Sequence, residues 1–123
     1  MPRISRRKLE HLDKLAGRDG VIAAAAMDQR GSLKKALAKE RGGEIGDREL
    51  EEFKVLVAEA LTPHASAILL DPEWGIPASK RRAKNAGLLM AYEKTGYDAA
   101  TPGRLPDLLD DWSVRTASPS TTE

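Results

Sequence analysis

Three short apolar segments alternate along the chain with longer segments of mixed polarity. Residues 21–27 (VIAAAAM), 66–70 (SAILL) and 88–92 (LLMAY) consist almost entirely of apolar or small residues, and each runs abruptly into polar ones. Segments of this length without polar alternation are typical of strands that are buried on both faces. We therefore expect three buried strands.

The segments around these strands carry apolar residues at helical spacing. The pattern predicts five helices, over approximately residues 9–15, 33–42, 48–62, 78–86 and 106–112. Ser32 and Asp47 are candidate N-caps for the second and third of them. Helix stops are expected near Gly17, Gly42 and Gly87.

The helix over residues 48–62 has the longest apolar stripe, which consists of Leu50, Phe53, Val57 and Leu61. Pro63 should end this helix because it disfavours the α conformation at the preceding residue. Strands that alternate with helices in this way pair in parallel, so the sequence predicts the α/β class. Three parallel strands leave both sheet edges open, which indicates part of a larger fold.

Composition narrows the possible partners. The chain has 123 residues with a formal net charge of +1, so no global field favours nucleic acid or an anionic membrane. It has no cysteine, and its longest apolar run is far shorter than the roughly 20 residues of a membrane helix. No export signal is indicated after the basic residues 1–8. We therefore expect a cytoplasmic protein.

Candidate site residues follow the three strands, because active-site groups of parallel α/β folds collect at the carboxyl ends of strands. Asp28, Asp71 and Glu93 are acids at such ends. Gln29 can orient a substrate hydroxyl together with Asp28, and Arg30 can bind a phosphate or pair with a carboxylate. A loop acid after a strand is also common without any functional role.

The remaining candidates are weaker. Lys94 could form a Schiff base in a dry pocket, or it is a loop lysine paired with Glu93. His11 and His64 are far apart in sequence, so we expect no metal site. The basic run 80–84 could contact phosphate, although a solvated helix face is the simpler interpretation. No phosphate-binding glycine motif occurs in the sequence.

Four blocks of the sequence resemble the N-terminal part of the class I, Schiff-base tagatose-bisphosphate aldolases and the related sulfofructose-phosphate aldolases. The blocks are AAMDQRGSLKK (25–35), FKVLVAEALTPHASAILLDPEWGIPA (53–78), AGLLMAYEKTGYDA (86–99) and RLPDLLDDWSV (104–114). They come in the family's order, and the resemblance runs from about Leu9 to Val114.

The resemblance implies a TIM (β/α)8 barrel of which this chain supplies about three βα units. It also implies reversible aldol cleavage of a ketose (bis)phosphate to dihydroxyacetone phosphate and an aldehyde, through an imine on a lysine, with no metal and no cofactor. By position, Asp28 and Gln29 match the family's first-strand site residues, with Asp28 assisting proton transfer. Asp71 and Glu93 lie at later strand ends on the same rim, where we expect Asp71 to bind substrate and Glu93 to have a catalytic role.

The chain departs from the family in length, since such a barrel takes about 250 residues. The family pattern breaks near Arg115, so we assign residues 1–117 to a partial aldolase domain and 118–123 to a polar tail. In the family the imine-forming lysine lies further along, so we expect a truncated chain that is inactive alone.

Two alternatives to this interpretation stay open. The first is a non-catalytic fragment, or a half-barrel that needs an oligomeric or complementing partner chain. The second is a small α/β module that binds sugar phosphates through Arg30 and the Lys80 cluster.

Overall fold

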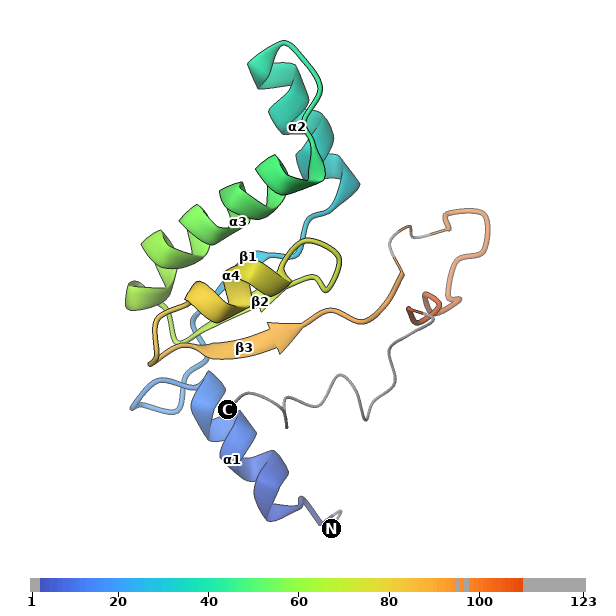
Figure 1. Cartoon of the computed structure of the whole chain (residues 1–123). Helices are drawn as coiled ribbons and strands as arrows, with labels where there is room; N and C mark the ends of the chain where they lie inside the picture. Colours follow the sequence, from blue (N-terminus) through green and yellow to red (C-terminus); the bar gives the residue numbers. More distant parts are fainter. Residues whose placement is uncertain (1–2, 95, 97, 110–123) are drawn as a thin grey trace.

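The structure, a computed structural model, describes residues 3–94, 96 and 98–109. Figure 1 shows their helices and strands along the chain. In chain order these are α1 (Arg6–Leu15), β1 (Ala24–Met27), α2 (Gly31–Arg41), α3 (Asp47–Leu61), the 3₁₀ turn η1 (Thr62–His64), β2 (Ala67–Leu70), α4 (Ile76–Arg81) and β3 (Gly87–Met90). The proposed boundary between residues 1–117 and 118–123 lies outside this part of the chain.

The three strands form one parallel sheet in the order β1-β2-β3. Ala24 is level with Ala67, and Ala67 with Gly87, so the strands start together and their carboxyl ends share one edge. This arrangement confirms the predicted α/β class. The sheet is unclosed, as expected for the first units of a (β/α)8 barrel.

One face of the sheet is covered by α3 and α4 (Figure 1). Ile68 and Leu70 of β2 are completely buried there against Ala58 of α3 and Ala78 of α4. Alternate residues of β1 and β3, with Val55 of α3, pack around this cluster: Ala25, Met27, Leu88 and Met90. Burying apolar side chains between the two layers is the main source of stability in such a unit.

The opposite face carries small residues on β1 and leucines on β2 and β3, and it is less covered at β1. Helix α1 lies on this side of the sheet (Figure 1), and it packs so closely that a Cβ on Gly87 would lie 2.5 Å from the Lys14 carbonyl oxygen. Ala24 and Ala26 of β1 are exposed. The prediction that β1 is buried on both faces is therefore wrong, because no described residues cover Ala24 and Ala26 on this face, the inner face of the sheet.

Two helix starts differ from the sequence prediction. Helix α2 begins at Gly31 with Arg30 at the N-cap and without a side-chain cap, so Ser32 lies inside the helix. Helix α3 has Gly46 at its N-cap, and Asp47 is the first helical residue. The Glu49 carboxylate instead accepts a hydrogen bond from the Gly46 amide. Both α2 and α3 end where glycine and proline predicted, at Gly42 and before Thr62.

Two predicted helix stops are also wrong in detail. Helix α1 is followed by Ala16 in an extended conformation, so Gly17 is not its cap. Helix α4 ends at Arg81, and the guanidinium of Arg82 then donates hydrogen bonds to the carbonyl oxygens of Ser79 and Ala86. The bond to Ser79 satisfies a carbonyl of the last turn of α4, and the bond to Ala86 ties the loop before β3 to the helix end. Gly87 is therefore the first residue of β3 and not a helix stop.

The last predicted helix is not formed in the part of 106–112 that the structure describes. None of residues 106–109 is helical, and Leu108 forms an antiparallel bridge with Glu93. The amide of Lys94 donates to the Asp107 carbonyl oxygen at 2.6 Å, and the Leu109 amide donates to the Tyr92 carbonyl oxygen at 2.8 Å. Residues 107–109 pair with the backbone of residues 92–94 instead of forming a helix.

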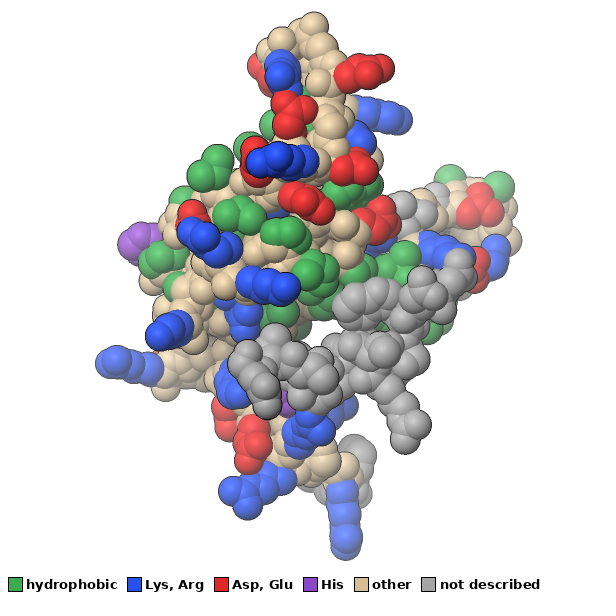
Figure 2. Space-filling model, in the orientation of Figure 1, with side chains coloured by type: hydrophobic (Ala, Val, Ile, Leu, Met, Phe, Trp, Pro, Cys, Tyr) green, Lys and Arg blue, Asp and Glu red, His purple; other side chains and the backbone are tan. Residues whose placement is uncertain are grey.

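The outer surface of α3 is partly apolar. Figure 2 shows hydrophobic side chains gathered over this helix, between the charged side chains that surround it. Leu56 is 65% exposed and Leu61 is 47% exposed. None of the described helices is both long enough and apolar enough to cross a membrane.

Candidate functional site

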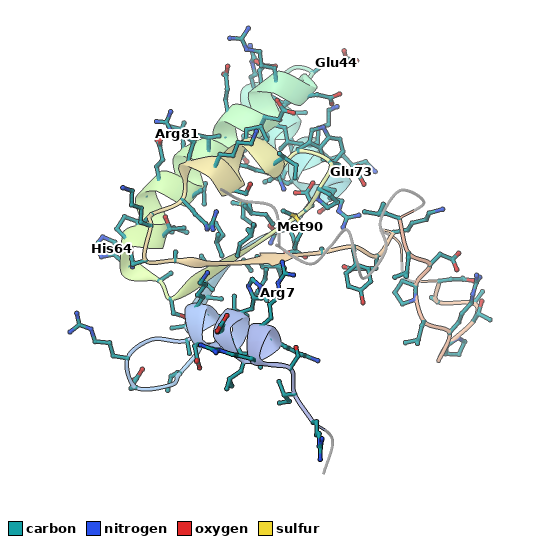
Figure 3. All side chains as sticks on the ribbon, turned by 60° about the horizontal axis from the view of Figure 1, so that its bottom comes forward. Arg7, Glu44, His64, Glu73, Arg81 and Met90 are labelled. Carbon is teal, nitrogen blue, oxygen red and sulfur yellow. The ribbon has the colours of Figure 1, made fainter. Side chains whose placement is uncertain are left out.

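The residues predicted for the site lie at the carboxyl ends of the strands. Asp28, Gln29 and Arg30 directly follow β1, Asp71 directly follows β2, and Glu93 lies three residues after β3. The strands point toward the side of the molecule where Figure 3 labels Glu73, and His64 lies at the opposite end. The parallel sheet therefore gathers these residues along one rim.

Arg30 connects the three strand ends. Its guanidinium Nη1 lies 3.3 Å from Oε1 of Glu73 in the β2 loop and donates a 3.0 Å hydrogen bond to the Glu93 carbonyl oxygen beyond β3. The residue is only 4% exposed. Its Nε is buried and has no hydrogen-bond partner among the described residues. A buried unsatisfied donor is costly, so an acceptor for this N–H is expected.

A second polar cluster lies just below the rim and was not foreseen from the sequence. Lys54 of α3 is completely buried, and its ammonium Nζ forms an ion pair with the equally buried carboxylate of Asp71. The same Nζ donates to the carbonyl oxygens of Met27 at 2.8 Å and Gln29 at 2.6 Å. Lys54 thus ties the end of β1 to the end of β2.

The buried side of α3 explains why Lys54 was missed. The completely buried residues of α3 and the turn after it follow a spacing of four: Leu50, Lys54, Ala58 and Thr62. The predicted stripe of Leu50, Phe53, Val57 and Leu61 is displaced around the helix, and Leu61 is 47% exposed. A lysine inside a row of otherwise small or apolar residues four apart is the signal that could have identified it.

Asp71 has both carboxylate oxygens engaged. Oδ1 faces Lys54, and Oδ2 accepts a 2.8 Å hydrogen bond from the Trp74 amide. The turn is tight, since a Cβ on Gly75 would lie 2.3 Å from the Asp71 carbonyl oxygen. The side chain of Asp71 therefore organises the β2 loop and has no surface exposed to the rim.

Asp28 and Gln29 occupy a different environment. The Asp28 side chain is half-buried, and within the described part of the chain it makes no hydrogen bond or ion pair. Gln29 is exposed, and only its backbone carbonyl is held by Lys54. Continuing the alternation of β1 by one residue places Asp28 on the side of Ala24 and Ala26, the uncovered face of the sheet.

Glu93 is half-buried at the third strand end. Its Oε2 accepts a 3.2 Å hydrogen bond from the Tyr92 amide, while its backbone carbonyl binds Arg30. Lys94 beside it donates its amide to Asp107. Arg30 therefore brings the β2 loop and the end of β3 together through one guanidinium.

The basic run 80–84 does not form a single cationic site. Lys80 is exposed, Arg81 pairs with Glu59 of α3, and Arg82 is turned onto backbone carbonyls. His11 and His64 lie on different elements, α1 and η1. Among the residues that the structure describes, no cluster of three or more metal-ligating side chains occurs.

An exposed ion pair joins the two helices that follow β1. The Lys34 ammonium of α2 donates a 2.6 Å hydrogen bond to Asp47 of α3, and it lies 5.7 Å from the ring centre of Trp74 in the β2 loop. This hydrogen bond, and the charge of Lys34, lower the pKa of Asp47 below its ordinary value of 3.8.

The pair predicts a pH dependence of folding stability. A lowered pKa in the folded state means that the pair stabilises the fold above the ordinary pKa, and this contribution is lost as the pH falls through the folded pKa. We expect Asp47→Asn to lower the urea midpoint slightly near pH 6, and by less as the pH falls below the ordinary value of 3.8. A midpoint difference that does not shrink as the pH falls would contradict this assignment.

Comparison with known proteins places this rim in context. A family model described as DeoC/LacD family aldolase matches residues 22–119. Tagatose 1,6-diphosphate aldolase 1 of Enterococcus faecalis (strain ATCC 700802 / V583) is 56% identical over 115 residues, which are 94% of this chain and 35% of that protein.

Two further relatives give the same picture. Tagatose 1,6-diphosphate aldolase 2 of the same organism is 62% identical over 103 residues, covering 84% of this chain and 31% of the relative. The tagatose 1,6-diphosphate aldolase of Listeria monocytogenes serotype 4a (strain HCC23) is 56% identical over 114 residues, covering 93% and 33% respectively. The chain spans about a third of the length of these curated relatives.

Proposed function

The chain belongs to the DeoC/LacD family of aldolases, and from this premise we propose that it forms the first part of the catalytic barrel of a ketose-bisphosphate aldolase. The proposed reaction is reversible cleavage of tagatose 1,6-bisphosphate or a similar ketose phosphate to dihydroxyacetone phosphate and an aldehyde. The observation that carries the proposal is the 56% identity to a tagatose 1,6-diphosphate aldolase over 94% of the chain.

Asp28 is the residue that we propose for proton transfer. Aldol cleavage needs a base that removes a proton from the hydroxyl next to the bond that breaks, while an imine accepts the electron pair. Asp28 is a half-buried carboxylate at the rim with no partner among the described residues, so it can accept such a proton. The imine-forming lysine belongs, by resemblance, to the two thirds of the relatives that this chain does not cover.

Gln29 and Arg30 are proposed to bind substrate beside Asp28. The exposed amide of Gln29 can donate to and accept from sugar hydroxyls. The unsatisfied Nε–H of Arg30 can donate to a phosphate or hydroxyl oxygen. Asp71 and Glu93 are proposed as residues that hold the rim together, because Asp71 is buried in an ion pair and Glu93 binds Arg30 through its backbone.

We further propose that catalysis requires a complementing barrel segment, either covalently joined or on a partner chain. The inner face of β1 is exposed, and a closed barrel would cover it. Cytoplasmic location is part of the proposal, since phosphorylated sugars are charged metabolites that do not cross a bilayer unaided.

The experiment joins the 123-residue chain to the remaining two thirds of the Enterococcus faecalis aldolase 1. We expect this chimera to cleave tagatose 1,6-bisphosphate, and Asp28→Asn to lower its kcat by about 10²–10⁴-fold, the usual contribution of a general base. The 123-residue chain alone should give no adduct when it is treated with dihydroxyacetone phosphate and borohydride.

Two results would contradict the proposal. A chimera that folds but does not cleave any ketose bisphosphate would refute the assignment of the rim to aldol chemistry. A stable borohydride adduct on the 123-residue chain would show that this segment carries its own imine-forming lysine. Lys80→Met on the exposed side of α4 serves as the control that should leave cleavage unchanged.

A further inference from the structure

Lys54 is an unusual residue for the middle of a helix that covers a sheet. Its side chain is completely buried, one helical turn from the equally buried Leu50 and Ala58. An ammonium in this environment is unfavourable unless every charge and donor is matched. The structure matches all of them, so the contacts of this one side chain are informative.

The three N–H donors of the Lys54 ammonium have three acceptors: the Met27 carbonyl, the Gln29 carbonyl and the Asp71 carboxylate. A lysine acting as a nucleophile needs a free, unprotonated amine close to substrate. Lys54 is enclosed and fully engaged, so it is not a candidate for imine formation. Its contacts are those of a residue that holds backbone in place.

The two carbonyl contacts flank Asp28. Met27 precedes Asp28 and Gln29 follows it, and both carbonyl oxygens point at the same ammonium. The backbone on either side of Asp28 is therefore fixed to α3, while the Asp28 carboxylate itself makes no hydrogen bond among the described residues. This arrangement fixes the direction of the Asp28 side chain and leaves its carboxylate oxygens able to accept a proton or a hydrogen bond.

Asp71 extends the same attachment to the second strand. The carboxylate balances the charge of Lys54 and also accepts the Trp74 amide, so one buried pair sets both the β1 exit and the β2 loop. A buried ion pair seldom adds stability over a well-packed apolar pair of the same volume. The pair is therefore better explained by the backbone positions that it fixes, at the β1 exit and in the β2 loop, than by added stability.

We propose that Lys54 is a positioning residue that holds Asp28 and Gln29 in their catalytic orientation by anchoring the carbonyl groups on either side of Asp28. The inference rests on the proposed function, because it assigns those two residues to the reaction. Misplacement of a reacting group by about 1 Å can cost 10²-fold in rate. Losing the anchor should therefore lower kcat with little change in KM.

The test compares three variants, Lys54→Met, the double variant Lys54→Met/Asp71→Leu, and Lys80→Met as the exposed-lysine control. The double variant removes both buried charges and restores an apolar pair, so most of the stability should return. The carbonyls of Met27 and Gln29 stay without their anchor. If Lys54 is a positioning residue, the double variant should regain stability, while the order of residues 28–30 and kcat stay low.

Two measurements decide the outcome. In the full 123-residue chain, amide order parameters at residues 28–30 should fall from about 0.85 to below about 0.6 in both Lys54 variants and stay unchanged in Lys80→Met. In the chimera, kcat of the double variant should be about 10²-fold low at near-normal KM. Normal order parameters and normal kcat in the stable double variant would overturn the proposal.

A failure of the proposed aldolase function can be distinguished from a failure of the positioning role of Lys54. A parent chimera that does not cleave ketose bisphosphate refutes the aldolase assignment, whereas the order parameters of the 123-residue chain still decide whether Lys54 anchors residues 28–30. Loss of order throughout the sheet, rather than at residues 28–30, would make Lys54 a general stability residue and overturn the positioning role.

Discussion

Replacing Asp71 by leucine is expected to destabilise the chain by about 3–5 kcal/mol, the usual cost of removing one partner from a buried ion pair. Leucine is close to aspartate in shape but leaves the Lys54 ammonium completely buried with only two carbonyl acceptors. The Trp74 amide also loses its acceptor. Urea unfolding followed by circular dichroism measures the change in midpoint and in the free energy of unfolding.

The matched control is the double variant Lys54→Met/Asp71→Leu. With both charges gone, the remaining loss should be smaller than that of Asp71→Leu. It reflects the hydrogen bonds that the Trp74 amide and the Met27 and Gln29 carbonyls no longer make. The two single losses and the double loss form a cycle that isolates the energy of the pair. A double variant as unstable as Asp71→Leu would show that the site cannot accommodate apolar side chains, and the ion-pair explanation would fail.

Gly75→Ala is expected to cost about 3 kcal/mol, near the top of the range for overpacking. The added Cβ would lie 2.3 Å from the Asp71 carbonyl oxygen and 2.9 Å from the Leu70 Cβ, and neither atom is at the end of a flexible side chain. The turn must open, which breaks the 3.0 Å bond from the Gly75 amide to the Asp71 carbonyl oxygen. Thermal unfolding monitored by circular dichroism measures the loss.

Gly31→Ala is the control for the same chemical change. Gly31 is the first residue of α2, has a negative φ, and a Cβ there meets nothing within 4 Å. Alanine should therefore be neutral or stabilise the chain by up to about 1 kcal/mol. If both glycine variants had the same effect, close contact at Gly75 could not be the cause.

The parts of the fold that follow from local pattern were predictable. Each of the three apolar segments overlaps the strand that was expected, and Pro63 and Gly42 end α3 and α2 as their conformational preferences require. Strand bounds differ where pairing decides them. Residues 21–23 are outside β1 because its ladder with β2 begins only at Ala24, level with Ala67.

The candidate site was only partly predictable. Residues after parallel strands share one rim, so the grouping of Asp28, Asp71 and Glu93 follows from topology. Topology does not determine whether each of these carboxylates is buried or exposed, or what it pairs with. Asp71 is buried because Lys54 reaches it from α3, seventeen positions earlier. The spacing of four could place Lys54 in the buried row of α3, but it does not say which carboxylate the lysine pairs with.

The antiparallel bridge between Glu93 and Leu108 has a consequence for how this unit could be extended. A fourth strand that continues the parallel order would need the outer edge of β3, and just beyond that strand residues 107–109 hold the backbone of Tyr92 and Lys94. To pair along Tyr92 and Lys94 as well, such a strand would have to displace residues 107–109 from their backbone. Two backbone hydrogen bonds, each worth about 1 kcal/mol net, would be replaced by new ones. Until that exchange, residues 107–109 occupy the backbone groups of Tyr92 and Lys94 that another chain could otherwise pair with.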